Sequence, residues 1–111
     1  MTSCIFCKIA NKEIKSQILF EDDDYIAFED TNPQAPTHFL VIPKKHIETI
    51  LDADSNTLGE LLNIASRQAV KKGISADGFR VVINCNRHGG QTVYHLHAHI
   101  MGGRWFTWPP G

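Results

Sequence analysis

Three histidines alternate with apolar residues near the end of the chain, at His95, His97 and His99. In an extended strand, side chains two residues apart point to the same face and lie roughly 7 Å from each other. The three imidazoles would therefore form one row, which is hard to explain as a polar surface that happens to be rich in histidine. Neutral imidazole is a nucleophile near pH 7, because its reference pKa is about 6.5, and it is also a common zinc ligand. The row predicts either nucleophilic catalysis or a three-histidine zinc site.

The segment directly before the row favours phosphate chemistry. It reads Gly89-Gly90-Gln91-Thr92. Glycines allow backbone N–H groups to approach a phosphate closely, and the Thr92 hydroxyl adds another donor. The segment is not a Walker-type loop, and two glycines alone would also suit a plain turn. Beside a row of histidines, however, this composition indicates a phosphate-bearing substrate rather than a catalytic metal.

The row belongs to an alternating segment that predicts the last strand, over residues 92–101. The apolar residues between and after the histidines would face the core. Four other segments have the composition of strands: two within residues 18–29 around an acidic turn, and one each over residues 38–43 and 79–85. Together with one long helix, they predict an α+β fold, in which an antiparallel five-stranded sheet carries the helix on one face.

The long helix is predicted over residues 57–72. Its apolar residues recur at helical spacing on one face, at Leu58, Leu61, Leu62, Ala65 and Ala69. Thr57 and Glu60 fit a capping box at its start, and Gly73 suits a left-handed conformation just beyond its end. This face offers no reactive groups, so we interpret it as core.

The bulk composition excludes several classes of function. The chain has 111 residues, which suits one domain, and 42% of them are hydrophobic. Its formal net charge of -1 provides no basic surface for DNA or RNA, so we expect no nucleic-acid partner. The sequence has no apolar run of membrane-spanning length, and its first residues do not resemble a signal peptide. We therefore expect a cytoplasmic protein without membrane contact, whose cysteines stay reduced.

Residues 95–101, His-Leu-His-Ala-His-Ile-Met, match the His-φ-His-φ-His-φ-φ signature of the histidine triad (HIT) family, where φ is apolar. The resemblance covers nearly the whole chain, with further matching motifs at residues 5–9, 20–23, 33–47 and 89–94. Gly102-Gly103-Arg104 and the final Trp108-Pro109-Pro110-Gly111 resemble the Hint branch of the family. The resemblance implies one HIT domain over residues 1–111, whose sheet continues across a two-fold homodimer.

The same resemblance assigns roles to individual residues. His97 resembles the nucleophile that attacks the α-phosphorus, His99 the histidine that contacts the phosphate, and His38 a residue that supports the row through a hydrogen-bond relay. With His95, these three make up the expected catalytic set. Asp30 matches the acid that receives the ribose hydroxyls, and Thr92 stands where many relatives have serine. The expected nucleotide contacts are Asp30, Asn84, Gly90, Gln91, Thr92, His97 and His99.

The implied reaction is hydrolysis of nucleoside 5′-phosphoramidates, which breaks the P–N bond and releases a nucleoside monophosphate and an amine. A nucleotidyl-His97 intermediate would form first and then react with water. The other ring nitrogen of His97 must donate to an acceptor, and a backbone carbonyl would serve. Purine nucleotides such as AMP or GMP derivatives are the expected substrates. Two alternatives stay open: a dinucleoside polyphosphate hydrolase of the Fhit-like branch, and a nucleotide-binding scaffold protein whose catalysis is vestigial.

Cys4 and Cys7 have the spacing of half a zinc site, although two buried reduced cysteines would fit the same pattern. Relatives with this pair bind zinc through the two cysteines, a histidine after the Lys-Lys stretch and the first triad histidine. The resemblance therefore implies a structural Zn²⁺ held by Cys4, Cys7, His46 and His95. Other members of the Hint branch lack the cysteines, so the chemistry does not require the metal. Cys85, on a predicted buried strand, is expected to pack in the core.

Overall fold

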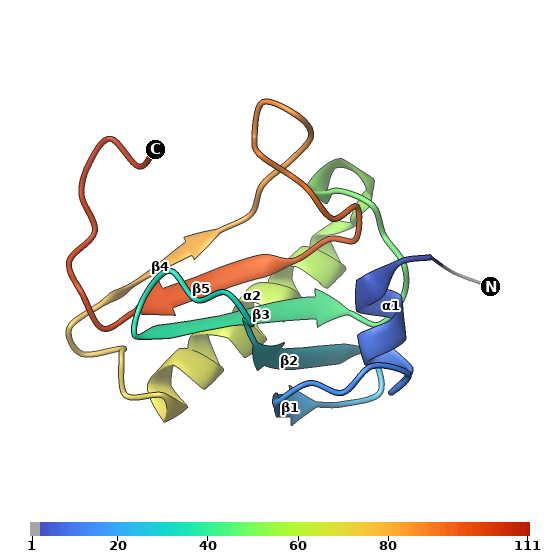
Figure 1. Ribbon diagram of the computed structural model, residues 1–111, viewed down its shortest axis with the longest axis horizontal. Helices are drawn as coiled ribbons and strands as arrows, with labels where there is room; N and C mark the ends of the chain where they lie inside the picture. The colour runs from blue at the N-terminus through green and yellow to red at the C-terminus, as the bar shows by residue number, and fades with distance from the viewer. Residues whose placement is uncertain (1–2) are drawn as a thin grey trace.

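Within residues 3–111, which the structure describes, five strands form one sheet in the order β1-β2-β3-β5-β4. The structure is a computed structural model, and every neighbouring pair of its strands is antiparallel. The strands are β1 (Ile18–Glu21), β2 (Tyr25–Glu29), β3 (Thr37–Pro43), β4 (Phe79–Val82) and β5 (Ala98–Gly102). Figure 1 shows β3 and β5 side by side in the middle of the sheet. This architecture confirms the predicted antiparallel five-stranded sheet of an α+β fold.

Helix α2 (Ser55–Lys71) packs on one face of the sheet, behind it in Figure 1. Leu61, Ala65 and Ala69 are buried there, as the helical spacing predicts. Leu62, in contrast, is 42% exposed, and Ile64 takes a core position. The buried stripe follows i, i+3, i+4 and i+8 from Leu61, and this spacing leaves Leu62 on its edge.

The ends of α2 correct one prediction and confirm another. The helix begins two residues earlier than predicted, because the Asp54 carboxylate caps it by accepting a hydrogen bond from the Thr57 N–H at 2.8 Å. The predicted capping box is therefore wrong: Glu60 instead accepts a hydrogen bond from the Tyr25 hydroxyl at 3.0 Å. Gly73, just beyond the helix, has a φ of 78°, as expected for a left-handed end.

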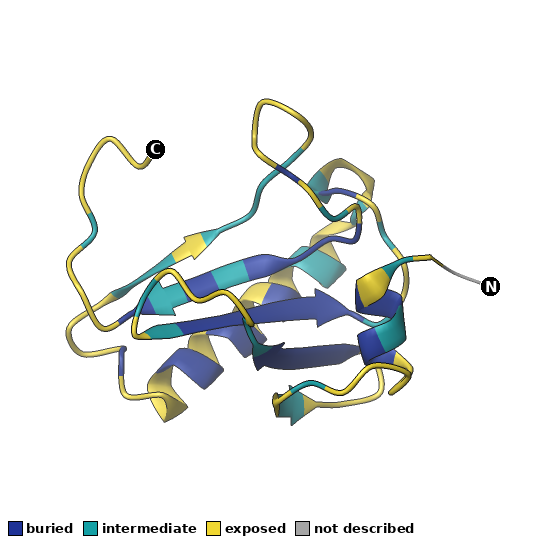
Figure 2. Cartoon of the chain, viewed as in Figure 1, coloured by how far each residue is buried: buried dark blue, intermediate teal, exposed yellow. Residues whose placement is uncertain are grey.

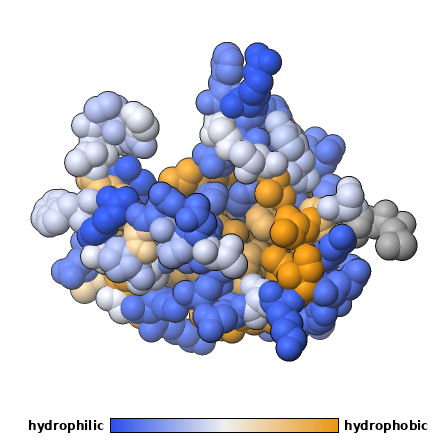
Figure 3. Space-filling view, in the orientation of Figure 1, coloured by the Kyte–Doolittle hydropathy of each residue, from blue (hydrophilic) through white to orange (hydrophobic). Residues whose placement is uncertain are grey.

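The opposite face of the sheet is only partly covered, by the short helix α1 (Ile5–Ala10). Its residues Phe6, Ile9 and Ala10 pack against side chains of β2 and β3 in a second apolar cluster. Hydrophobic residues gather around α1 in Figure 3, whereas the tip of the loop between β4 and β5 is hydrophilic. The sequence motif around the cysteines did not predict this helix. Its position leaves the face over β5 and β4 open.

Alternation along β3 and β5 separates the core from the open face. Phe39, Val41 and Ile100 are fully buried under α2, in line with the nearly continuous burial of β3 in Figure 2. Residues of the other parity, His38 and His99, therefore point to the face opposite α2. The sheet thus presents histidines to one side and aliphatic side chains to the other.

Strand β5 begins at Ala98, not at residue 92 as predicted. The last pair that it forms with β3 is Val41–Ala98, and β3 ends at Pro43, which has no N–H to continue the ladder. The Leu96 N–H bonds instead to the Ile47 carbonyl at 2.6 Å. Strand β4 ends at Val82, where it pairs with His99, rather than at residue 85. Cys85, expected in the core, therefore lies beyond the strand and is only half-buried. Alternation nevertheless continues before β5, because Leu96 is buried in the cluster under α2.

The remaining helical element is the 3-10 helix η1 (Ile50–Asp52), which precedes α2. A membrane-spanning helix needs roughly 20 apolar residues. Within residues 3–111, the helices are all too short or too polar to meet that requirement.

Candidate active site

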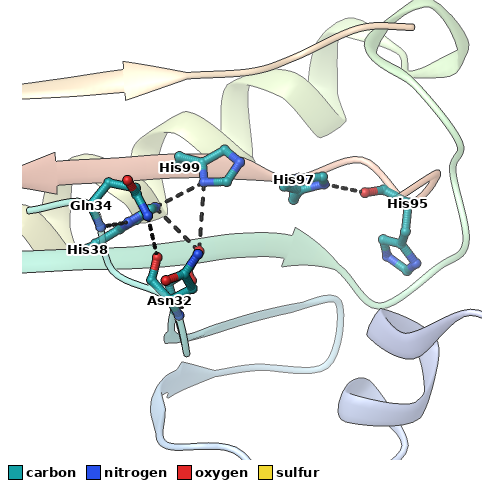
Figure 4. A network of polar contacts seen from close by, with 7 residues as sticks. Asn32, Gln34, His38, His95, His97 and His99 are labelled. Atoms are coloured by element: carbon teal, nitrogen blue, oxygen red, sulfur yellow. Dashed lines mark hydrogen bonds and ion pairs between the residues drawn. The ribbon is translucent and has the colours of Figure 1, made fainter. Parts of the chain in front are cut away.

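His38 on β3 and His99 on β5 form the centre of the site. His38 pairs in register with Met101, two residues beyond His99, so the two histidines are diagonal neighbours on one face. Their ring centroids are 5.2 Å apart, and His38 Nε2 lies 3.0 Å from His99 Nδ1. Figure 4 shows that the histidines continue from this pair to His97 and His95, in the segment that leads into β5. The predicted row of histidines is therefore confirmed, with His38 joined to one end.

His97 presents the nitrogen of a nucleophile. Its Nδ1 lies 2.7 Å from the backbone carbonyl oxygen of His95. A carbonyl only accepts hydrogen bonds, so Nδ1 carries the proton and Nε2 keeps its lone pair. Burial lowers the pKa of His97 below its usual 6.5, which keeps the ring neutral at pH 7. The expected carbonyl acceptor is confirmed.

A hydrogen-bond relay fixes the opposite tautomer in His99. The Gln34 backbone N–H donates to His38 Nδ1 at 3.0 Å, so the proton of neutral His38 is on Nε2. His38 Nε2–H then donates to His99 Nδ1, and His99 must carry its own proton on Nε2. Burial, followed by the proximity of His97 and His38, lowers the pKa of His99 to about 4. His99 is therefore a neutral ring that offers an N–H donor.

Asp30 lies beside the relay, with Oδ2 at 3.4 Å from His38 Nε2 and 3.9 Å from His99 Nδ1. Its Oδ1 accepts a hydrogen bond from the Asn32 N–H at 2.7 Å. One carboxylate and two histidines could in principle hold a metal. The Gln34 N–H occupies Nδ1 of His38, however, so the proton is on Nε2, the nitrogen that would have to coordinate. The arrangement favours a proton relay over a metal site.

A second cluster lies at the other end of the row, where four ligand atoms come within 4.8 Å of one another. Cys4 caps α1 and Cys7 lies within it, His46 follows β3, and His95 precedes β5. His95 is fully buried, and its Nε2 donates to the Pro43 carbonyl at 2.7 Å. Its Nδ1 lone pair therefore points at the two sulphurs. The predicted set of four metal ligands is brought together.

The spacing of this cluster fits a tetrahedral metal. Bonds of about 2.3 Å to sulphur and about 2.0 Å to nitrogen, at the tetrahedral angle, place a sulphur and a nitrogen about 3.5 Å apart. The His95 Nδ1 atom lies 3.4 Å from Cys4 Sγ and 3.5 Å from Cys7 Sγ. The His46 Nδ1 atom lies 3.2 Å from Cys7 Sγ. These four side chains can hold a metal ion with little rearrangement.

The loop before the row is held by Gln91 rather than opened toward a ligand. The buried Gln91 side chain accepts from the Asn86 N–H at 2.9 Å and donates to the Glu48 carbonyl at 2.8 Å. The backbone N–H groups of Gly90 and Gln91 also donate within the loop. A Cβ on Gly89 would lie 2.4 Å from a backbone oxygen, so the tight turn needs glycine there. We conclude that this segment gives the loop its shape.

The remaining predicted contacts, Asn84 and Thr92, lie in the segment between β4 and β5. Asn84 is half-buried, just after β4. Thr92 is exposed and lines a surface hollow together with His46 and Tyr94. Figure 3 shows the surface hollowed between this loop and the C-terminal tail. The nucleotide contacts expected of Asn84 and Thr92 stay predictions.

Two participants were not predicted from the sequence. The Phe6 ring packs edge-on against His97, with centroids 5.0 Å apart, and restricts one side of that imidazole. Gln34 starts the relay through its backbone N–H. Phe6 lies between Cys4 and Cys7, and the spacing of these cysteines indicated only a metal site. A backbone donor such as Gln34 leaves no sequence signal, because every residue but proline has the same group.

Comparisons with known proteins agree with this geometry. Residues 11–105 match the family model of the HIT domain. The chain is 48% identical over 103 residues to the purine nucleoside phosphoramidase of Escherichia coli (strain K12), a match that covers 90% of this chain and 87% of that protein.

Solved structures are similar over most of their length. A HIT family hydrolase from Legionella pneumophila Philadelphia 1 superimposes with a TM-score of 0.95 at 52% identity, covering 98% of this chain and 100% of that one. A Zn-bound histidine triad family protein from Mycobacterium smegmatis has a TM-score of 0.84 at 30% identity, covering 92% and 76% of the two chains. Because the chain carries the three histidines and its residues 11–105 match the family model, it belongs to the histidine triad family.

Proposed function

We propose that the protein hydrolyses nucleoside 5′-phosphoramidates to a nucleoside monophosphate and an amine. The observation that carries this proposal is the hydrogen bond from His97 Nδ1 to the His95 carbonyl, which leaves Nε2 as a nucleophile. The purine nucleoside phosphoramidase of E. coli, 48% identical to this chain, supports the same substrate class. We infer a purine nucleotide, such as an AMP or GMP derivative, as the nucleotide part.

The reaction proceeds in two displacements at phosphorus. His97 Nε2 attacks the α-phosphorus, the P–N bond breaks, and the departing amine takes up a proton from solvent. Water then attacks the phosphorus of the nucleotidyl-His97 intermediate and releases a proton to solvent, and the N–P bond breaks, which returns the neutral ring and frees the monophosphate. The His99 Nε2–H group, aligned by His38, donates to a phosphoryl oxygen as negative charge grows there.

We assign the nucleotide contacts to the side chains around this row. The Asp30 carboxylate binds the ribose hydroxyls, because its hydrogen bond from Asn32 leaves further lone pairs for other donors. Asn84 and Thr92 contact the ribose or phosphate from the loop side. Gly90 and Gln91 contribute the shape of that loop, since their N–H groups already bond within it.

We propose that the Cys4, Cys7, His46 and His95 cluster binds a structural Zn²⁺. The four donors form a closed set of the type that zinc prefers, with sulphur-to-nitrogen distances of 3.2–3.5 Å. The Zn-bound relative from M. smegmatis supports this assignment. The ion would supply no reactive chemistry here; it would tie α1 to the segment before β5. Thiolate ligands of this kind persist in a reducing compartment, which supports a cytoplasmic location.

We also propose a two-fold homodimer of single-domain chains that extends the sheet through β4. This strand forms an edge of the sheet, where unpaired backbone groups can bond to a second copy. Val81 on β4 is 37% exposed, and Trp105 and Trp108 are 95% and 82% exposed. Aromatic residues are enriched at interfaces. Light scattering should give twice the 12.5 kDa of one chain; the mass of one chain would contradict the proposal.

The central experiment is mass spectrometry of the intact protein mixed with adenosine 5′-phosphoramidate. Wild type should carry a nucleotidyl adduct during turnover, and His97→Ala should show neither adduct nor turnover while still binding AMP. His88→Ala, which removes an exposed histidine from the β4–β5 loop, is the matched control and should behave like wild type.

Three outcomes would contradict the proposal. Near-normal turnover by His97→Ala would show that His97 is not the nucleophile. Faster hydrolysis of diadenosine polyphosphates than of the phosphoramidate would indicate the Fhit-like activity. AMP binding by wild type without turnover of any phosphoramidate would indicate a scaffold protein.

A further inference from the structure

Arg104, in the tail that follows β5, reaches back to the loop that starts the relay. Its Nε and Nη2 groups both donate to the Gln34 carbonyl, at 3.2 and 3.0 Å, and Nη1 donates to the Trp105 carbonyl at 3.0 Å. The guanidinium also stacks on the Phe106 ring, 4.2 Å from its centroid. Arg104 is exposed, yet its planar fork is held on several sides.

The two glycines before Arg104 make this approach possible. Gly103 has a φ of 92°, and a Cβ there would lie 2.9 Å from the Pro36 side chain. A Cβ on Gly102 would lie 2.8 Å from the Ile74 side chain, beneath the sheet. The chain can therefore turn tightly against Pro36 only with glycine at position 103, while the absence of a side chain at Gly102 leaves room for Ile74. The Gly102-Gly103-Arg104 motif has a geometric purpose: it places the guanidinium on Gln34.

Gln34 connects this contact to the catalytic histidines. Its carbonyl accepts from Arg104, and its N–H donates to His38 Nδ1 at 3.0 Å. These two groups belong to adjacent peptide units that share the Gln34 Cα, so a bond that holds the carbonyl also restrains the position of the residue that presents the N–H. Figure 4 shows Gln34 beside His38, and its side chain donates to the Asn32 carbonyl at 3.0 Å. The loop is thus fixed from within and, at Gln34, by Arg104.

We propose that Arg104 is a positioning residue that, through Gln34, fixes the proton of His38 on Nε2 and thereby keeps the proton of His99 on the nitrogen that faces the phosphate. Without Arg104, Gln34 would reorient, and its N–H would no longer hold Nδ1 of His38 unprotonated. His38 would then populate both tautomers, and His99 would spend less time as a donor from Nε2. The inference rests on the proposed function for its kinetic consequence, but not for its structural one.

The kinetic test compares Arg104→Ala with Arg80→Ala on adenosine 5′-phosphoramidate. Arg80 is the matched control, because it also lies over the Phe106 ring, at 5.2 Å, and donates to the tail at the Thr107 carbonyl, but makes no bond to Gln34. Arg104→Ala should lower kcat roughly 10- to 100-fold with KM changed less than about two-fold. Arg80→Ala should keep wild-type kcat.

The structural test measures the imidazole tautomers by long-range ¹H–¹⁵N correlation in the full-length protein without substrate. Wild type should show His38 protonated on Nε2, and Arg104→Ala should show a mixture of the Nδ1 and Nε2 forms. Low concentrations of guanidinium chloride should restore part of the kcat of Arg104→Ala, whereas sodium chloride at equal ionic strength should not. The Arg104→Lys variant should keep only part of the wild-type kcat, since an ammonium group lacks the planar fork of donors of the guanidinium.

Each contrary result has a distinct meaning. Unchanged kcat and unchanged tautomers in Arg104→Ala would overturn the inference and leave the proposed function standing. A rise in KM alone, or an equal loss of kcat in Arg80→Ala, would also overturn it, because the tail would then act directly on the substrate. If wild type does not turn over phosphoramidates, the proposed function fails, and the tautomers still decide the role of Arg104.

Discussion

The two ends of the histidine row use the same side chain for opposite purposes. At the metal end, defined by Cys4, Cys7, His46 and His95, the His95 ring is fully buried and donates from Nε2 to a carbonyl, which turns its Nδ1 toward two sulphurs. At the relay end, defined by Gln34, His38, Asp30 and His99, the His99 ring accepts at Nδ1 and offers Nε2–H. The residue type is therefore the same at both ends, and the partner of the second ring nitrogen decides the role.

The two ends also differ in what holds them. The metal end joins side chains from segments far apart in the sequence, so it should mainly govern the stability of the fold. The relay end is built on the backbone of one loop and two paired strands, so it should mainly govern turnover. His97 lies between them and contacts the metal end through the His95 carbonyl and through Phe6, whose ring packs against both histidines.

The largest expected effect is on stability, at the metal end. Cys7→Ala should lose the metal and lower Tm by roughly 10 °C or more, because binding of a structural metal adds directly to folding free energy. Metal analysis together with differential scanning calorimetry measures both. Cys85→Ala, a half-buried cysteine outside the cluster, is the control and should retain the metal. A chelator that leaves the Tm of wild type unchanged would show that the cluster has no structural metal.

A pair of His38 variants separates the two functions of the relay. The Oδ1 atom of His38→Asn can replace Nδ1 as the acceptor for the Gln34 N–H, but nothing then donates to His99. The amide of His38→Gln can reach the position of Nε2 and keep that donor. We expect kcat to fall roughly 10- to 100-fold in His38→Asn and less in His38→Gln, with metal content unchanged in both. Equal losses in the two variants would contradict a relay that runs through Nε2.

The histidine row was predictable because alternation is a local property of the chain. Residues 95–101 keep their parity even though the ladder begins only at Ala98. Where β5 starts was not predictable, since this limit depends on Pro43 at the end of a different strand. The hydrophobic spacing of α2 likewise predicted its buried stripe but not Asp54 as its cap.

The direction of each imidazole proton was the least predictable part of the site. The family motif places His38, His97 and His99 together. Their tautomers, however, follow from the Gln34 N–H and the His95 carbonyl, groups that every such position carries. For the same reason, the sequence predicted phosphate contacts for Gly90 and Gln91, whereas their N–H groups bond within the loop. Backbone hydrogen bonds within a few residues decide both matters, and the residue types do not reveal them.

A smaller effect should follow from substituting the glycine that turns the tail toward the relay. Gly103→Ala should lower the free energy of unfolding by about 1–2 kcal/mol, because it places a Cβ at positive φ and against Pro36. It should also lower kcat, since Arg104 would be displaced. Gly59→Ala is the matched control: it lies within α2 with open space around it, and should raise stability by up to about 1 kcal/mol. Urea unfolding and steady-state kinetics test both variants. A wild-type kcat in Gly103→Ala would contradict the prediction, because it would show that the turn at Gly103 is not needed for turnover.

The smallest effect is the dependence of stability on pH that arises from His99. Burial lowers its pKa in the folded protein to about 4, against about 6.5 in an unfolded chain, so the unfolded state binds more protons between these values. The free energy of unfolding should therefore be highest above pH 6.5 and fall as the pH drops toward 4. By pH 5 the part due to His99 should reach about 1 kcal/mol, after allowance for a side chain that is 21% exposed. Urea unfolding at pH 7 and pH 5 should show a smaller loss in His99→Gln than in wild type. Both proteins carry the same metal ligands, so the difference between them excludes acid release of the metal, and an equal loss would show that His99 protonates in the folded state as easily as in the unfolded one.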